Sequence, residues 1–324
     1  NTDQALTVDN PWGLNVDQER FKAYAKLGVI PTDAHPNRSI GFINKFSSYR
    51  QVGNYGLKLY DGTNNYWYSN VIFQDQLIKK EHTIKLGGGF FIDNYNESLN
   101  DTYNEELLET ERKERAGGAF AEYTYYPNIR FTMIAGGRVD YNNLFGWFAT
   151  PRVHLRDKLR KNLTWRLASG SGQRTPNVFV DNPRTMVSSR RINIPSNLQQ
   201  EKAWNFGSSL VWDFLMADRE ALVTVDVFHT EFENMLIMDM DASRTELNFY
   251  NLGGRSYSTV GQVEVNYELL KRLDTRVSYK MQDVRTTFTD GNLEKVPFVA
   301  KNKFLFNTGY TTANKMWSID ITAL

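Results

Sequence analysis

The sequence predicts an all-β protein, a transmembrane antiparallel up-and-down β-barrel, and two observations carry that prediction. The first is the alternation over residues 129–141, where odd positions are mostly apolar or small and most even positions are polar or charged. A period of two gives a strand one oily face and one wet face, and it returns over residues 221–231 and 263–269. The second is that tight polar turns alternate with longer connections, as expected for the two rims of such a barrel.

Composition agrees with a membrane barrel even though it looks like that of a soluble protein. The mean hydropathy is −0.51, and no apolar run approaches the roughly 20 residues that a membrane helix needs. Only one face of a barrel strand meets lipid, so a negative average is expected. Aromatic residues make up 14% of the chain, a supply that suits the girdles at the two membrane interfaces.

Charge and cysteine content exclude several functions. With 38 Lys and Arg against 37 Asp and Glu, the formal charge is +1, which predicts no nucleic-acid partner. The chain has 0 Cys, so a disulfide, a thiolate metal site and a cysteine nucleophile are all excluded. The first residues lack the basic start and apolar segment of a signal peptide, so we expect a mature, processed or partial chain.

Strands of about ten residues, long enough to cross a bilayer at a tilt, can be placed along the whole chain. We predict them, in order, at residues 21–29, 40–49, 66–78, 83–93, 117–126, 129–141, 147–155, 163–171, 203–214, 221–235, 256–269, 275–285, 303–310 and from Met316 onward. Several end in aromatic residues, as interfacial girdles require: Trp147, Trp165, Trp204, Trp212 and Phe214.

The connections between these strands fall into two groups. Tight turns are predicted at residues 126–128, 157–162, 215–220, 271–273 and 311–315, and long loops at 94–115, 142–146, 172–201, 238–246 and 286–301. We expect the long loops outside the cell and the tight turns on the periplasmic side. Because a closed barrel pairs its last strand with its first, and neither chain end looks finished, residues 1–324 are expected to be part of a larger barrel domain.

Several sequence blocks resemble TonB-dependent outer-membrane receptors, particularly the kind found in Bacteroidetes. They run over nearly the whole chain and, in order, are NPWG at 10–13, GAFAEY at 118–123, GRVD at 137–140, TPRV at 150–153, RLASGSGQRTP at 166–176, SSR at 188–190, NLQQEKAWNFG at 197–207, FHTEFEN at 228–234 and FYNLGGRS at 249–256. The block at 166–176 is the strongest, and the order of the blocks makes the match specific.

The resemblance implies a barrel of about 22 strands closed by an N-terminal plug. It also implies import of a scarce, bulky nutrient, an iron chelate (siderophore) or a cobalamin-like corrinoid, with energy from the TonB–ExbB–ExbD complex. The plug, the N-terminal segment that contacts TonB and the last strands are expected to be absent from this chain. Outer-membrane lipid, the nutrient and a surface lipoprotein are the other partners that the resemblance suggests.

The loop over residues 172–201 holds the candidate substrate-binding residues. These are Arg174, Phe179, Arg184, Arg190 and Arg191, with Met186 nearby. Guanidinium groups bind an anionic chelate or a phosphate-bearing corrinoid through charge-assisted hydrogen bonds. The alternative is that Arg174 and Arg190 brace the loop. Haem receptors of the superfamily carry a histidine in this loop; this loop has none, which disfavours haem.

On the strands, one face is expected to meet lipid and the other to line the lumen. The lipid-facing set includes Ile129, Phe131, Met133 and Val139. The lumen-facing set is Glu122, Arg130, Arg138, Arg152, Arg166 and Asp226. We interpret the second set mainly as solvated residues that pair with one another, with direct substrate contact as the alternative.

No resident cofactor is predicted. His35, His82, His154 and His229 lie on separate segments without ligand spacing. Residues 239–243 begin like a calcium loop, yet Arg244 and Tyr250 replace its Gly and Glu, so at most loosely bound calcium is expected there. Three methionines, Met235, Met238 and Met240, could suggest copper but suit a strand end better. The triple glycine at 87–89 lacks the Lys-Ser/Thr of a phosphate loop.

Two other functions were weighed. A SusC-like glycan or peptide importer working with a surface lipoprotein is the nearest alternative, although such proteins are generally larger. An outer-membrane barrel enzyme is less favoured, because no Gly-x-Ser-x-Gly or comparable nucleophile arrangement occurs. The chain is therefore predicted not to be an enzyme. A soluble propeller or solenoid would show a fixed internal period, which the unequal loops do not allow.

Overall fold

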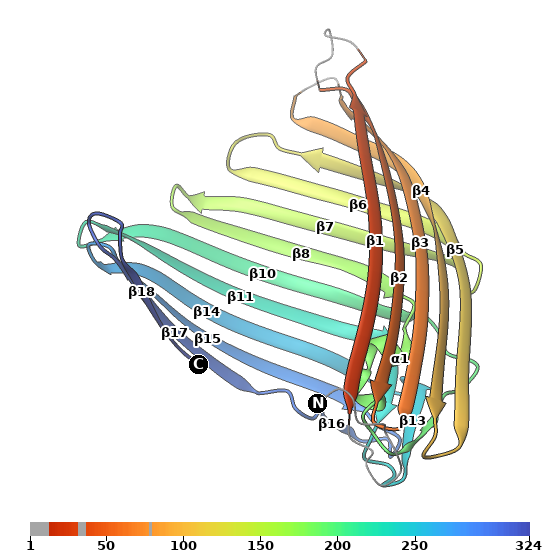
Figure 1. Cartoon of the computed structure of the whole chain (residues 1–324). Coiled ribbons are helices and arrows are strands. Elements are labelled where there is room, and N and C mark those ends of the chain that lie inside the picture. Colours follow the sequence, from red (N-terminus) through yellow and green to blue (C-terminus); the bar gives the residue numbers. More distant parts are fainter. Residues whose placement is uncertain (1–12, 32–36, 78–79) are drawn as a thin grey trace.

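The computed structural model describes residues 13–31, 37–77 and 80–324, which form one long antiparallel sheet curved into an open wall (Figure 1). All but one of its 15 strands follow a single path in chain order. Along that path lie β1 (Leu14–Val29), β2 (Ser39–Tyr55), β3 (Lys58–Gln76), β4 (His82–Asp101), β5 (Glu106–Tyr125), β6 (Phe131–Asn142), β7 (Gly146–Arg160), β8 (Leu163–Arg174), β10 (Glu201–Met216), β11 (Arg219–Asn234), β14 (Ser256–Leu270), β15 (Leu273–Thr287), β17 (Asn302–Thr311) and β18 (Ser318–Ala323), while β16 (Leu293–Lys295) pairs with β15.

The predicted fold class is confirmed: each predicted strand corresponds to one strand of this path. Neighbouring strands are antiparallel throughout, as in an up-and-down barrel wall. Within the described residues β1 and β18 do not pair with each other, so the wall is open on that side (Figure 1). None of the helical segments in the described part of the chain has the length and apolarity of a membrane span.

The strand register collects apolar side chains on the outer face of the wall. Directly opposed residues share a face, and Leu210, Val225, Val263 and Tyr279 stand opposite one another across β10, β11, β14 and β15. A lipid-facing band of this kind replaces a buried core, because apolar side chains that soluble proteins bury can meet lipid instead. The alternation read from the sequence therefore becomes a lipid-facing surface.

The band stops well before the ends of β3, β4 and β5 at Lys58, Asp101 and Glu106. On β3 the outer row changes at Trp67, beyond which it continues as Asn65, Thr63 and Asp61. Its partner row on β4 changes after Ile92 in the same way. About eight residues of each strand, roughly 25 Å at about 3.3 Å per residue, therefore extend beyond the bilayer.

The predicted asymmetry between the two rims is present. Tight turns at residues 161–162, 217–218 and 271–272 join strands on one rim, and the connections 175–200, 235–255 and 288–301 lie on the other. We call these the short-turn rim and the long-loop rim. The block at 10–13 and His35 fall wholly or mostly outside the described residues.

Two predicted long loops are wrong. Residues 94–115 are strand: β4 and β5 stay paired up to Asp101 and Glu106, and only residues 102–105 turn. The outer face becomes polar there because it has left the lipid, and that polarity suggested a loop. The second, at 142–146, is a turn of three residues between paired Asn142 and Gly146, whose φ of +79° is readily adopted by glycine.

Candidate functional site

Two connections of the long-loop rim fold back into the curve of the sheet (Figure 1). Residues 175–200 contain α1 (Val178–Asp181), the 3-10 helix η1 (Pro183–Thr185) and β9 (Arg191–Asn193), and residues 235–255 contain β12 (Leu236–Asp239) and β13 (Glu246–Asn251). β13 pairs antiparallel with β12 and parallel with β9, which makes a small three-stranded sheet. We call these two segments the cap. It was not predicted as a folded unit.

The cap has its own hydrophobic core, built against the inner face of the wall. Its buried residues are Val178, Phe179, Met186, Ile192, Leu247 and Phe249, which pack with Tyr60 of β3 and Leu99 of β4. The rings of Phe179 and Tyr60 meet edge to face, with centroids 6.3 Å apart. The cap is therefore a packed structure over the inner face and not a set of independent loops.

Polar contacts tie the cap to the same strands. Lys58 forms a buried ion pair with Asp101 at 2.8 Å and donates from Nζ to the carbonyl of Arg190 at 3.4 Å. On β5, Arg112 donates to Asn177 Oδ1 at 2.6 Å, and Glu106 pairs with Arg191 at 2.7 Å. Burying a paired charge costs less free energy than burying an isolated one, and the pair holds one geometry. These bonds therefore set where the cap packs on β3–β5.

The four predicted arginines all lie on the cap or at its entry, but they face different partners. Arg174 pairs with Glu201 at 2.6 Å and with Asp181 at 3.3 Å. Arg190 donates to the carbonyl of Met240 and Arg191 pairs with Glu106. Arg184 is exposed, and its guanidinium lies 6.0 Å from the ring of Phe298 in the loop 288–301. Three of the four therefore have bracing contacts, and Arg184 presents its charge to solvent.

Phe179 requires a correction to the predicted role. Its side chain is 0% exposed at the centre of the cap core, so in this conformation it cannot touch a ligand. Its apolar character was read as a contact surface, but the partners that bury it, Tyr60 and Leu99, come from distant strands. Phe179 therefore supports the fold of the cap and does not line its surface.

Asp239, the first residue of the segment considered for calcium, joins two of the long connections, 235–255 and 288–301. Its Oδ1 accepts the backbone N–H groups of Asp241 and Ala242, and its Oδ2 accepts the hydroxyls of Tyr250 at 3.0 Å and Thr289 at 2.8 Å. Burial alone raises the pKa of this carboxyl, but the hydrogen bonds outweigh burial and hold the pKa below its ordinary value. Both oxygens are thus engaged by protein donors.

Glu97 is a second buried carboxyl under the cap, on the part of β4 that lies beyond the lipid band. It accepts hydrogen bonds from the hydroxyls of Tyr60 at 2.8 Å and Thr110 at 3.3 Å. Burial raises the pKa of Glu97, and these hydrogen bonds offset burial only in part. Asp239 and Glu97 therefore respond to pH in opposite directions.

The remaining candidate ligand side chains are dispersed. His82 stacks with Tyr125, and His229 contacts Glu231 at 3.2 Å on the outer face. Met238 and Met240 pack against the cap core, as expected for residues at a strand end. Within the ranges 13–31, 37–77 and 80–324, no group of three or more His, Cys, Asp or Glu side chains is placed to hold a metal ion.

Three of the six charged residues predicted to line the lumen are paired on the inner wall. Glu122 accepts hydrogen bonds from Lys85 at 3.0 Å and Arg152 at 2.6 Å, and Arg138 pairs with Asp140 at 2.6 Å. Among the described residues no ion pair or side-chain hydrogen bond is formed by Arg166 or Asp226, and Arg130 lies in the turn before β6, where it donates to the carbonyl of Lys158 at 3.4 Å. It belongs to the short-turn rim and not to the lumen wall.

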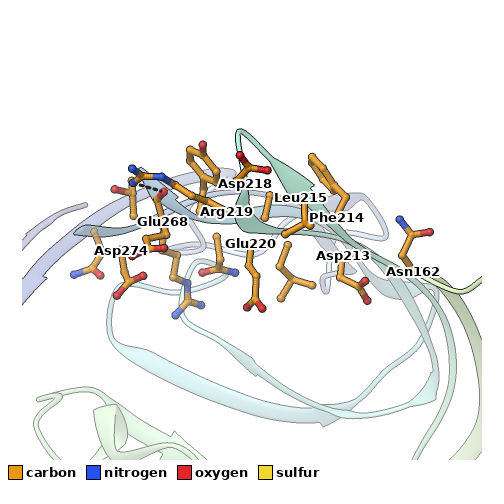
Figure 2. A pocket seen from close by; sticks show the side chains of 16 residues that line it. Asn162, Asp213, Phe214, Leu215, Asp218, Arg219, Glu220, Glu268 and Asp274 are labelled. Carbon is orange, nitrogen blue, oxygen red and sulfur yellow. Dashed lines mark hydrogen bonds between the residues drawn. The ribbon is translucent and has the colours of Figure 1, made fainter. Parts of the chain in front are cut away.

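A hollow of about 1170 Å³ at the short-turn rim was not predicted. Asp213, Glu220 and Asp274 line it and point to the same side of the wall, while Arg219 donates to the carbonyl of Glu268 at 3.4 Å (Figure 2). The available sequence signal was the presence of these acidic residues close to the tight turns at 217–218 and 271–272. This acidic surface lies at the opposite rim from the cap.

Comparison with known proteins gives one family and many similar structures. The chain matches the family model of the TonB dependent receptor-like β-barrel over residues 4–323. Solved structures similar to it include the copper transporter OprC (11% identity, TM-score 0.70, 96% of this chain and 52% of that one). Another is a double mutant of the Serratia marcescens hemophore receptor HasR in complex with its hemophore HasA and heme (10% identity, TM-score 0.72, 95% and 58%).

A third similar structure is the alcaligin outer-membrane receptor FauA from Bordetella pertussis (12% identity, TM-score 0.65, 95% of this chain and 54% of that one). The chain thus spans about half the length of the solved structures that it matches. At such low identity the likeness is one of fold. No curated protein matches the chain.

Proposed function

We propose, because the chain belongs to the TonB-dependent receptor β-barrel family, that its parent protein imports an anionic metal chelate with energy supplied through TonB. The chain itself is an outer-membrane β-barrel wall. Family and similar structures are transporters and receptors, which supports transport and not catalysis as the activity. In this proposal the long-loop rim faces the outside of the cell.

The observation that supports a binding role most directly is the cap. It places four arginines from one segment, residues 174–191, at the outer mouth of the wall. A packed cap lowers the entropy cost of binding because its side chains are already ordered. The exposed guanidinium of Arg184, whose ring neighbour Phe298 comes from another loop, is the group we assign to the ligand.

For the ligand we propose a ferric siderophore, with a cobalamin-like corrinoid as the second candidate. Both carry anionic groups that guanidinium binds. The name of the siderophore receptor PiuA from Acinetobacter baumannii supports the first candidate. We further propose that the parent protein is a receptor of the Bacteroidetes type and that it works with TonB–ExbB–ExbD through a region outside this chain. Any bound calcium or surface lipoprotein would be accessory to import.

The test begins with native mass spectrometry and elemental analysis of the intact receptor purified in mild detergent. Iron or cobalt carried with a small organic mass supports a chelate. A co-purifying lipoprotein without metal would instead favour a SusC-like glycan or peptide importer. Detection of neither metal nor lipoprotein would leave the binding assay below to decide.

The second part of the test measures how tightly the Arg184→Ala receptor binds an added ferric siderophore, or added cobalamin, whether or not a chelate co-purifies. Loss of one charge-assisted hydrogen bond of roughly 1.5–3 kcal/mol should weaken binding by about 10- to 150-fold. Arg219→Ala, which removes an arginine at the opposite rim, is the matched control and should bind normally. Equal affinity of the two variants would remove Arg184 from the site.

A further inference from the structure

Residues 106–115 of β5, at its long-loop-rim end, have an unpaired edge. β5 pairs with β4 from Tyr125 up to Glu106, but with β6 only from Tyr125 up to Ala116. Residues 106–115 therefore continue past the turn that joins β6 and β7, and Figure 1 shows β5 running well beyond that turn. This is not the open side of the wall, because β6 is present and pairs with residues 116–125 of the same strand.

The backbone direction at Arg115 identifies the amides that face this edge. Its carbonyl accepts the N–H of Asn143 at 3.0 Å, and its own N–H donates to Asn143 Oδ1 at 2.7 Å. Alternate residues of a strand point the same way, so the N–H groups at positions 107, 109, 111 and 113 face the edge as well. Among the described residues, these four N–H groups have no hydrogen-bond partner.

A groove of about 610 Å³ lies beside this edge. Its lining includes Leu108 and Thr110 of β5, Phe145 of the β6–β7 turn, and Ile194 and Leu198 of the cap. Cap residues 176–178 and the inner-row residues Tyr95 and Glu97 of β4 also line it, so the groove lies between the inner face of β4–β5 and the cap. A strand added along the edge of β5 would turn alternate side chains into this groove.

The outer row of the edge carries two glutamates, which bear on the identity of the occupant. The side chains that project outward are Leu107, Glu109, Glu111 and Lys113; Lys113 pairs with Glu111 at 2.5 Å, and Glu109 has no ion pair among the described residues. A second copy of this chain would bring glutamates of the same kind together. Copies in one membrane also have the same orientation across it, so their β5 strands run in the same direction. Two such strands could pair only in parallel, unlike the antiparallel strands of this sheet.

We propose that residues 107–113 of β5 and the adjoining groove bind an extended segment of a partner protein as an added antiparallel strand. The free amides supply main-chain hydrogen bonds, the groove takes alternate apolar side chains, and the glutamates favour basic side chains on the outer face. Such a segment alternates apolar and basic residues. The partner reaches it from the cell surface, a direction that rests on the proposed orientation of the long-loop rim.

The test uses the synthetic peptide acetyl-(Lys-Val)₄-amide and the intact receptor in detergent. In an added strand, residues that share the outer face with Glu109 and Glu111 are those whose N–H and C=O groups point at β5, and here these are the lysines. N-methylation of the lysines should weaken binding at least tenfold, whereas N-methylation of the valines should have little effect. Equal loss from both peptides, or no binding at millimolar peptide, would overturn the proposal.

Two receptor variants complete the test. Glu111→Pro deletes one free N–H, and its ring is tolerated because that N–H bonds nothing in the sheet; Glu111→Ala keeps it. We expect at least tenfold weaker peptide binding for the proline variant relative to the alanine variant, and equal affinities would refute the pairing. Hydrogen exchange gives an independent check: the four amides should exchange fast in the free intact receptor and slowly with peptide. Slow exchange without peptide would mean that the receptor's own chain covers the edge.

Discussion

Phe179→Ala should open the cap without unfolding the wall. The side chain is fully buried against Tyr60 and the apolar residues of β9 and β13. Replacing a buried Phe by Ala costs about 3–5 kcal/mol, and every 1.4 kcal/mol is about a tenfold change in an equilibrium constant. The population of open cap should therefore rise by roughly two to three and a half orders of magnitude. The strand ladder of β10 and β11 does not contact Phe179 and should keep its stability.

Hydrogen exchange of the intact receptor measures this directly. Amides in the paired strands β12 and β13 should exchange faster by that factor, while those of β10 and β11 should not change. Val180→Ala is the matched control, since Val180 lies in the same helix but is 42% exposed. Unchanged exchange in β13, or equal acceleration throughout the wall, would refute the view that the cap is a separate packed unit.

Three other variants test the electrostatics and the lipid band. Asp239→Ala leaves the hydroxyls of Tyr250 and Thr289 without their acceptor and should destabilise the cap by about 1–3 kcal/mol. Because its pKa is lowered, Asp239 stabilises the cap fully above the unfolded value of about 3.9, and this is lost as pH falls through the lower folded pKa. Limited proteolysis of the cap between about pH 2 and pH 5, a range that brackets the unfolded carboxyl pKa, should show this loss of stability in the parent and not in the variant. Glu97 behaves oppositely: its raised pKa means that its contribution is full below about 4.3 and is lost as pH rises through the folded pKa. Glu97→Gln should thus protect the cap from proteolysis at neutral pH, and a variant cleaved as fast as the parent would contradict this. Val225→Arg places a charge in the lipid band and should cost roughly 2–4 kcal/mol in urea unfolding from liposomes, whereas Thr224→Arg on the opposite face should cost much less.

The wall could be predicted from the sequence because its residues obey a local rule. A strand that meets lipid on one side and a polar interior on the other alternates with a period of two, and this rule placed one predicted strand on each strand of the path. The rule failed on the outer stretches of β4 and β5, where Asn94, Asn96 and Glu109 face water and not lipid. There the inner row of Tyr95, Glu97 and Leu99 still alternated, but polarity on the outer row concealed it.

The cap could not be predicted, because its order depends on contacts between distant segments. β9 is three residues long and is defined only by its pairing with β13 from another loop. The arginines were found because guanidinium groups in one long loop are a compositional signal. Which of them is braced depends on Glu106, Glu201 and the Met240 carbonyl, partners that no local pattern identifies.

One feature of the wall, the unequal height of β5 and β6, accounts for both the cap and the groove. The tall inner face of β3–β5 gives the cap a surface to pack on, and the short β6 leaves the edge of β5 free beside it. Residues Ile194 and Leu198 belong to the cap and also line the groove. A strand held between them and β5 therefore contacts the closed cap and loses part of its site when the cap opens. Binding and closure must then be coupled by the same free energy in both directions. Phe179→Ala, which touches neither the edge amides nor the groove, should weaken binding of the (Lys-Val)₄ peptide, and saturating peptide should slow exchange in β12 and β13. If the variant opens the cap yet binds the peptide with unchanged affinity, the peptide is held by the edge of β5 alone and the cap plays no part in the groove.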